Sequence, residues 1–162
     1  MRRDPALGSG DLTQSSKNPR TSGSCTLAML AALLAACGGD ASTPRQACVD
    51  HINSLRATQG LAPLNRWVAN EDCADAQARS DAQSGQAHGA FGACPNSAQN
   101  ECPGWPSLTG QNGIVPGCLD SMWSEGPGGG HYDNMTGSSY TLVACGFAST
   151  PDGRVWSVQD FR

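Results

Sequence analysis

The segment 122–148 constrains the fold of this chain more than any other part of its sequence. Four glycines lie between positions 126 and 130, and they are followed at once by His131 and later by a strand-like run that contains a cysteine. Glycine loses more backbone freedom on folding than any other residue, so an ordered loop this rich in glycine is kept for geometry or for function. We interpret His131 and the nearby Glu125 as candidate site residues; the alternative is a surface turn with an incidental histidine.

The first 36 residues have the features of a secretory signal. Basic residues precede an apolar run at 27–36 that is too short to span a bilayer. The run ends in the sequence LAACGG, which resembles the lipobox of bacterial lipoproteins, and in that class the cysteine, here Cys37, is lipidated and becomes the first mature residue. We predict a signal peptide at 1–36, a lipid-anchored tether at 37–43 and a folded domain at 44–162, exported to the cell surface or the periplasm. An ordinary cleaved signal and a freely secreted protein are the alternative.

Charge restricts the partners of the mature chain. The leader holds four of the ten basic residues and two of the fourteen acidic ones, so the remainder has six arginines, no lysine and a formal charge of −6. An acidic surface without lysine argues against nucleic acid and anionic membrane surfaces as partners. Membrane contact is therefore expected only through lipid on Cys37, and the domain is expected to be monomeric.

Six cysteines follow Cys37, an even number in an exported chain, and we predict three disulfides. No Cys-x-x-Cys pair is present, so a thiolate metal site is not expected. Six cysteines can pair in several ways, and Cys94 and Cys102 are close enough in sequence to close the stretch between them. The assignment is Cys94–Cys102, Cys48–Cys73 and Cys118–Cys145.

The pattern of apolar and turn residues predicts an α+β domain. Thr43 and Pro44 are typical of a helix start, and Gly60 and Gly85 of helix ends. Glycines and prolines between 88 and 117 leave little room for regular structure apart from short strand pieces. A Thr-Pro-Asp-Gly turn separates two alternating runs near the end of the chain, which should form a hairpin in a mostly antiparallel sheet. The predicted elements are helices at 44–59, 71–84 and 118–123 and strands at 140–149 and 153–161.

Three motifs resemble the CAP superfamily of cysteine-rich secretory proteins, antigen 5 and pathogenesis-related proteins. The first-helix signature matches at Asn53, Arg56, Gly60, Pro63, Leu64 and Trp67. The segment 123–147 is similar to the second signature in its bacterial form, and 155–161 is similar to the last strand of the family. The resemblance covers 45–162, and it implies a three-layer α-β-α sandwich, stapled by disulfides, with a central cleft.

The resemblance also implies a set of cleft residues. Members of the superfamily typically place two histidines and two acidic residues in the cleft, and in several of them these bind a divalent metal. By motif position His88 and His131 match the histidines, and Glu125 approximates one of the acidic residues. Tyr132, next to the second histidine, is assigned to the same cleft. The ligands of a Zn²⁺ or another divalent cation would then be His88, His131 and Glu125.

This chain departs from the family at the second acidic position. Gln99 in Ala-Gln-Asn, or Gln111 in Gly-Gln-Asn, stands where the family has glutamate. A neutral amide oxygen is a poorer ligand for a hard cation than a carboxylate, and it cannot act as a general base. Glu101, two positions beyond Gln99, is the residue able to compensate.

These residues support three functions. The first is a surface-anchored module that binds a small apolar molecule or an extracellular protein at a histidine-lined cleft, with or without a metal. The second is a metal-dependent hydrolase or protease that uses His88, His131 and Glu125 to activate water. Against it, no oxyanion stabiliser is identified, and oxidised cysteines supply no thiolate nucleophile. The third is purely structural, with the two histidines holding the loops together.

Overall fold

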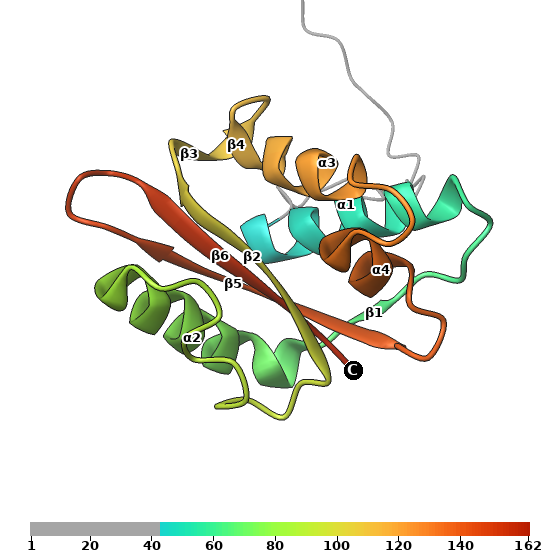
Figure 1. The fold of residues 1–162 in the computed structure, drawn as a ribbon, viewed down its shortest axis with the longest axis horizontal. Helices are drawn as coiled ribbons and strands as arrows, with labels where there is room; N and C mark the ends of the chain where they lie inside the picture. The colour runs from blue at the N-terminus through green and yellow to red at the C-terminus, as the bar shows by residue number, and fades with distance from the viewer. Residues whose placement is uncertain (1–42) are drawn as a thin grey trace, which may run out of the picture. The chain divides into compact units, whose positions relative to one another are not determined.

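The computed structural model describes residues 43–162. The predicted signal peptide at 1–36, the predicted lipidation site Cys37 and all but the last residue of the predicted tether at 37–43 lie outside the described residues. Between residues 43 and 162, no helix combines the length and the apolar character needed to cross a membrane. The elements, labelled in Figure 1, are α1 (Pro44–Ala57), β1 (Asn65–Arg66), a 3₁₀ turn (Val68–Asn70), α2 (Glu71–Ser84), β2 (Ala98–Trp105), β3 (Ser107–Gly110), β4 (Gly113–Pro116), α3 (Gly117–Trp123), α4 (Gly130–Thr136), β5 (Leu142–Ser149) and β6 (Val155–Phe161).

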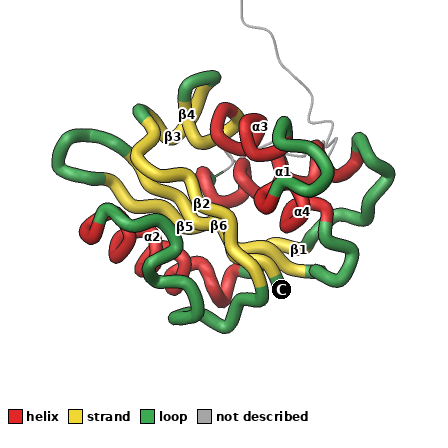
Figure 2. The backbone as a smooth tube through the Cα atoms, viewed as in Figure 1, coloured by secondary structure: helices red, strands yellow, loops and turns green. Residues whose placement is uncertain are grey.

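The sheet is mixed. Its strand order is β1-β5-β6-β2, in which β1 runs parallel to β5 and the other neighbours are antiparallel. The predicted hairpin is confirmed as β5 and β6. Two short parallel strands, β3 and β4, form a separate pair. Helix α2 packs against β5 and β6 (Figures 1 and 2). Helix α1 contacts β5, α4 contacts β2 and α3 contacts β4, and these three helices also contact one another.

Local signals account for the first two helices. The hydroxyl of Thr43 accepts a hydrogen bond from the backbone N–H of Gln46 at 3.3 Å, and Pro44 occupies the first turn of α1. Helix α2 carries two acidic residues in its first turn and ends at Gly85, which adopts a left-handed backbone conformation with φ of +68°. The predicted range 71–84 is confirmed for α2, whereas α1 ends two residues before its predicted boundary, at Ala57.

The short strands β3 and β4 agree with the strand pieces predicted between 88 and 117, but the eight-residue strand β2 was not predicted, and its sequence explains why. Residues 98–102 are all buried although three of the five are polar, so they show no alternation of apolar and polar residues. Burial on both faces removes that alternation. Pro103 and Gly104 fall where the pairing of β2 with β6 shifts register, between Cys102 and Trp105, and this irregularity lets a proline and a glycine stand within a strand.

Three disulfides form, as predicted, but the assigned partners are wrong. The bridges are Cys48–Cys145, Cys73–Cys94 and Cys102–Cys118, in place of Cys94–Cys102, Cys48–Cys73 and Cys118–Cys145. Short sequence separation misled the assignment, because Cys102 belongs to the core shared with α1 and α3, whereas Cys94 ends a loop that returns to the first turn of α2. Each bridge therefore links a helix to a strand or a loop of another part of the domain.

Two residues of the first-helix motif anchor the chain that follows α1. The side-chain amide of Asn53 donates to the carbonyl of Leu64 at 2.9 Å and its oxygen accepts from the Leu64 N–H at 2.8 Å. Arg56 is buried, and its guanidinium donates to the carbonyl of Met135 at 2.6 Å, at the end of α4. These contacts hold α4, and the histidine it carries, against α1.

Candidate functional site

The two histidines singled out in the sequence lie together. The ring centroids of His88 and His131 are 6.4 Å apart, and the ring planes differ by 28°. His88 lies in the loop after α2, and His131 lies in the first turn of α4. Their backbones are 43 positions apart in sequence, and β2 joins them, because it contacts both segments.

His88 is held by two contacts with β2. Its backbone N–H donates to Glu101 Oε2 at 2.5 Å, and its Nδ1 lies 2.9 Å from Gln99 Oε1. His88 has a φ of +59°, a left-handed conformation that is uncommon for a residue with a side chain. Such a conformation persists where its surroundings fix it, and here the two β2 contacts do so.

His131 is held by Glu125. Its Nδ1 lies 2.5 Å from Glu125 Oε1, and its backbone N–H donates to Glu125 Oε2 at 3.2 Å. The hydrogen bond from the His131 side chain lowers the pKa of Glu125. The glycine loop makes this possible: a Cβ at Gly129 would lie 2.4 Å from the Glu125 Cβ, so a side chain there would displace the carboxylate. The glycines therefore serve to fold Glu125 back over the histidine.

Amide side chains join α4 to β2 beneath the two rings. Asn134 Nδ2 donates to the carbonyl of Gln99 at 3.2 Å and to Asn100 Oδ1 at 2.9 Å. Asn100 Nδ2 in turn donates to the carbonyl of His131 at 3.0 Å. This neutral network fixes the position of His131 relative to Gln99 without placing a charge in the cleft.

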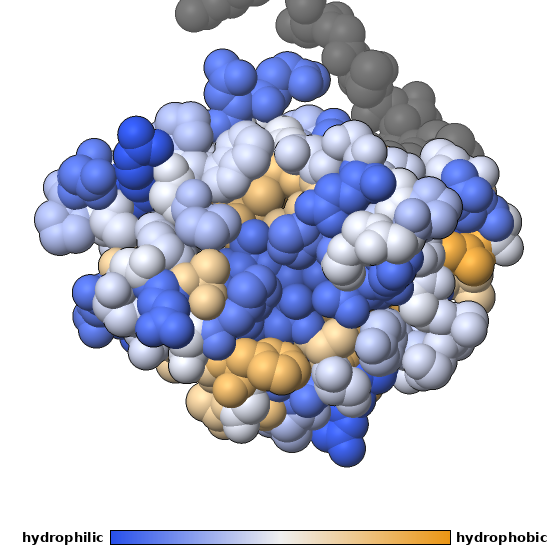
Figure 3. Space-filling view, in the orientation of Figure 1, coloured by the Kyte–Doolittle hydropathy of each residue, from blue (hydrophilic) through white to orange (hydrophobic). Residues whose placement is uncertain are grey.

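A hollow of about 320 Å³ opens beside His88, and its lining side chains are His88, Phe91, Ala98, Gln99 and Asn134. Phe91 is half exposed and was not identified from the sequence; its position three residues after His88 was the available signal. Figure 3 shows a hydrophilic band across the middle of this face, with apolar patches on either side of it. The hollow thus combines polar groups with an aromatic wall.

The other predicted site residues, including His131 and Glu125, are not among the side chains that line this hollow. The Tyr132 ring packs against Trp123, with centroids 4.7 Å apart, and is not among the lining side chains. Gln111 lies in the turn between β3 and β4, whereas Gln99 lies in β2 beside His88. The Glu101 carboxylate is buried and binds the backbone of His88, 3.8 Å from that ring's Nδ1.

Glu101 belongs to a buried pair of carboxyl groups. Asp81 Oδ1, on α2, accepts from the N–H of Ala90 at 2.7 Å, so both carboxyl groups pin the loop that carries His88. Asp81 Oδ2 and Glu101 Oε1 are buried and receive no hydrogen bond from any described residue. Burial, with a smaller contribution from the neighbouring Asp81, raises the pKa of Glu101 to about 7. A proton on Glu101 would supply the donor that the pair lacks.

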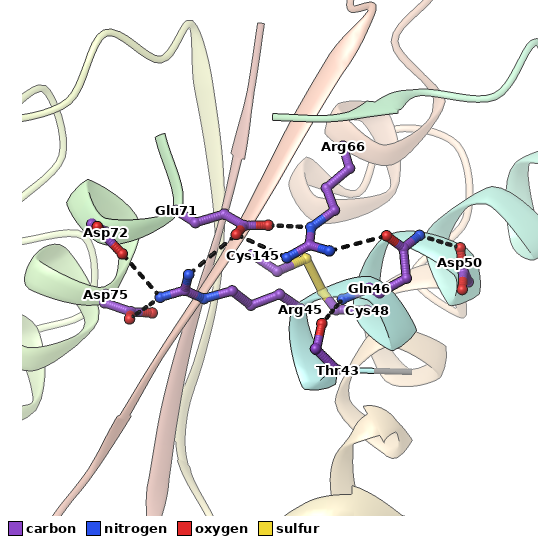
Figure 4. A network of polar contacts seen from close by, with 10 residues as sticks. All are labelled: Thr43, Arg45, Gln46, Cys48, Asp50, Arg66, Glu71, Asp72, Asp75 and Cys145. Carbon is purple, nitrogen blue, oxygen red and sulfur yellow. Dashed lines mark hydrogen bonds and ion pairs between the residues drawn. A yellow bond between two sulfur atoms is a disulfide. The ribbon is translucent and has the colours of Figure 1, made fainter. Parts of the chain in front are cut away.

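A separate ionic network lies away from the histidines (Figure 4). Arg45 of α1 contacts Glu71, Asp72 and Asp75 of α2, and Arg66 of β1 contacts Glu71 through Nε at 2.5 Å. The Cys48–Cys145 bridge passes beside this network. These ion pairs connect α1, β1 and α2, and Arg45, Arg66 and Asp75 also line a cavity of about 390 Å³.

The donor set does not fit the divalent metal that the family resemblance implies. Within residues 43–162, no group of three or more histidine, cysteine or acidic side chains is placed to hold a metal ion. Glu125 is engaged by His131, and Gln99 offers only a neutral amide oxygen to His88. Two imidazole nitrogens without a free carboxylate fall short of the three protein ligands that catalytic zinc requires.

Comparisons with known proteins agree with the motifs. The sequence model of the cysteine-rich secretory protein (CAP) family matches residues 49–161. Among solved structures, venom allergen-like protein 4 of Schistosoma mansoni is similar, with a TM-score of 0.51 and 11% identity over 74% of this chain and 88% of that chain. At this identity the likeness supports the fold alone. No curated protein matches the sequence. Because the family match spans most of the chain, the protein belongs to the cysteine-rich secretory protein (CAP) family.

Proposed function

We propose that this CAP module, with helices layered on both faces of its sheet, binds a small, largely apolar molecule in the hollow lined by His88 and Gln99, beside His131. The observation that carries the proposal is the half-exposed Phe91 beside His88 in a hollow of about 320 Å³. Ligand sites usually combine apolar walls with a few polar groups that fix orientation, and this hollow has the size of a small one. Neither the ligand nor a reaction follows from the fold.

Replacing Phe91 tests this proposal. In an NMR titration of the folded domain with 1-octanol, the amides of His88, Phe91 and Gln99 should shift. Phe91→Ala should weaken binding by about tenfold, because it removes an aromatic contact of roughly 1.4 kcal/mol. Val68→Ala is the matched control, since Val68 is an exposed apolar residue outside the hollow. Shifts at another surface, or equal affinity of the two variants, would reject this site.

The second candidate is a hydrolase. It is favoured by the 2.5 Å contact of Glu125 with His131, because a carboxylate on one ring nitrogen orients a histidine to act as a general base. The metal-dependent form of this function needs ligands that the described residues do not bring together.

Zinc addition tests the metal-dependent form of the second candidate. We expect micromolar Zn²⁺ to leave the melting temperature of the folded domain unchanged, because a ligand stabilises a protein only when it binds the native state. The parallel sample is His131→Ala. A melting temperature that Zn²⁺ raises in the wild type and not in this variant would restore the metal site.

We also propose that the module is exported as a monomer and held at a membrane through lipid on Cys37. The three disulfides support an oxidising compartment. Labelled palmitate should be incorporated into the wild-type chain and lost in Cys37→Ser, as read by autoradiography. Label that persists in Cys37→Ser would place the modification elsewhere.

A further inference from the structure

Gln99 has a partner that the cleft motifs do not include. Gln99 of β2 and Asp160 of β6 are directly opposite each other in the antiparallel pairing. Gln99 Nε2 donates to Asp160 Oδ1 at 3.1 Å, and Asp160 is fully buried. Asn70 and Asn96 also donate to this carboxylate, at 3.0 and 2.5 Å. Asp160 therefore accepts from three amides and has no cation beside it among the described residues.

This contact fixes which way the Gln99 amide points. Burial raises the pKa of Asp160, and its three amide donors oppose that rise because they favour the carboxylate. A carboxylate has no hydrogen to donate, so in this form of Asp160 the NH₂ group of Gln99 faces it. The amide oxygen is then turned toward His88, 2.9 Å from its Nδ1. A carbonyl oxygen accepts only, so Nδ1 must carry the proton. Glu101 Oε2, 3.8 Å from the same nitrogen, favours the same tautomer.

His131 carries its ring proton on the same nitrogen as His88, Nδ1, but for a different reason. Glu125 accepts at His131 Nδ1, which again places the ring proton there. In a neutral imidazole the other nitrogen, Nε2, is then an acceptor. Neither Nε2 has a hydrogen-bond partner within the described part of the chain, and the His88 and His131 side chains are 43% and 33% exposed.

We propose that Asp160 is a positioning residue that sets the His88 tautomer through Gln99, so that His88 Nε2 is an acceptor for a ligand in the hollow. The inference rests on the proposed function and specifies its ligand class: an apolar molecule that donates a hydrogen bond, such as an alcohol. The carboxylate that the family places in the cleft at position 99 is absent here, and a buried carboxylate lies behind it at Asp160. Position 99 therefore offers no negative charge to a divalent cation.

The chain has three histidines, so their ring nitrogens can be assigned by NMR. Two-dimensional ¹H–¹⁵N spectra of the neutral rings at pH 8, without ligand, should show the Nδ1–H tautomer for His88 and His131. His51 serves as the internal control, because its Nε2 lies 2.7 Å from Asp120 and should carry the proton. Asp160→Asn can donate to the Gln99 oxygen and lets the amide turn over. His88 should then shift toward the Nε2–H tautomer, while His51 and His131 keep theirs.

Ligand preference provides the functional readout. The wild type should bind 1-octanol about tenfold more tightly than methyl octyl ether, which has no hydrogen to donate, a difference equivalent to roughly 1.4 kcal/mol. In Asp160→Asn this preference should fall or reverse. Binding of both ligands with equal affinity in the wild type would overturn the inferred ligand class while leaving the proposed site intact. Binding of neither would reject the proposed function, and the ligand-free tautomers would still decide the role of Asp160.

Gln99→Met is the second variant, in case the buried Asn at position 160 prevents folding. Methionine removes the amide oxygen from His88 but leaves Asp160 with two amide donors, Asn70 and Asn96. The His88 tautomer ratio should change in this variant too. A folded Asp160→Asn or Gln99→Met protein in which the His88 nitrogen shifts equal those of the wild type would overturn the proposal.

Discussion

Glutamine in place of Glu101 should stabilise the domain above neutral pH by about 3 kcal/mol and have little effect near pH 4. The pKa of Glu101 is raised to about 7 by burial and by Asp81. A raised carboxyl pKa means that its contribution to stability is fully present below the ordinary glutamate pKa and is lost as the pH rises through about 7. Glutamine keeps the acceptor for the His88 N–H, adds a donor toward Asp81, and never ionises.

Urea unfolding at pH 4.5 and pH 8 measures this effect. The difference in the free energy of unfolding between Glu101→Gln and wild type should be small at pH 4.5 and large at pH 8. Glu125→Gln is the control: its carboxyl pKa is lowered, so its contribution is lost as the pH falls, and glutamine there should give no gain at pH 8. A constant gap at both pH values, or a less stable Glu101→Gln at pH 8, would show that Glu101 is not buried beside Asp81.

Alanine in place of Gly146 should destabilise the domain by about 3 kcal/mol or more. A Cβ on Gly146 would lie 2.2 Å from the carbonyl carbon of Ala74 and 2.4 Å from the backbone nitrogen of Asp75. Both atoms belong to the backbone of α2, which cannot turn aside as a side chain does. To admit one methyl group, α2 must move away from β5, and the small alanine core between them would open.

Thermal and urea unfolding of Gly146→Ala check this prediction. Gly130→Ala is the matched control, because its Cβ would meet no atom within 4 Å and its backbone has no positive φ. Alanine at Gly130 should leave stability unchanged or raise it slightly, since it lies in α4. If Gly146→Ala is as stable as wild type, α2 does not pack on β5 as closely as described.

Local sequence signals predicted those helices and turns that are determined by residues close together in the chain. Caps and glycine stops located α1 and α2, and the Thr-Pro-Asp-Gly turn located the β5–β6 hairpin. Strand β2 was missed because its buried polar residues follow no period. Disulfide pairing was missed because it is decided by which helix lies on which strand, and sequence separation carries little of that information.

The residues of the candidate site likewise fall into those that the sequence predicted and those that only the structure reveals. Motif positions supplied His88, His131, Gln99 and Glu125, all of which the structure places near one another. Asp160 had no such signal, because its link to Gln99 exists only through the register of β2 with β6. Asp81 likewise meets Glu101 only when α2 packs on the sheet. Site residues that are brought in by contacts between elements distant in sequence thus cannot be identified from motifs.

The most direct test of the account is a crystal structure of the folded domain with 1-octanol. We predict the alcohol in the hollow beside His88, with its hydroxyl within hydrogen-bond distance of His88 Nε2 and its chain against Phe91. An alcohol bound at another surface, or one in this hollow whose hydroxyl makes no hydrogen bond with His88, would contradict the account.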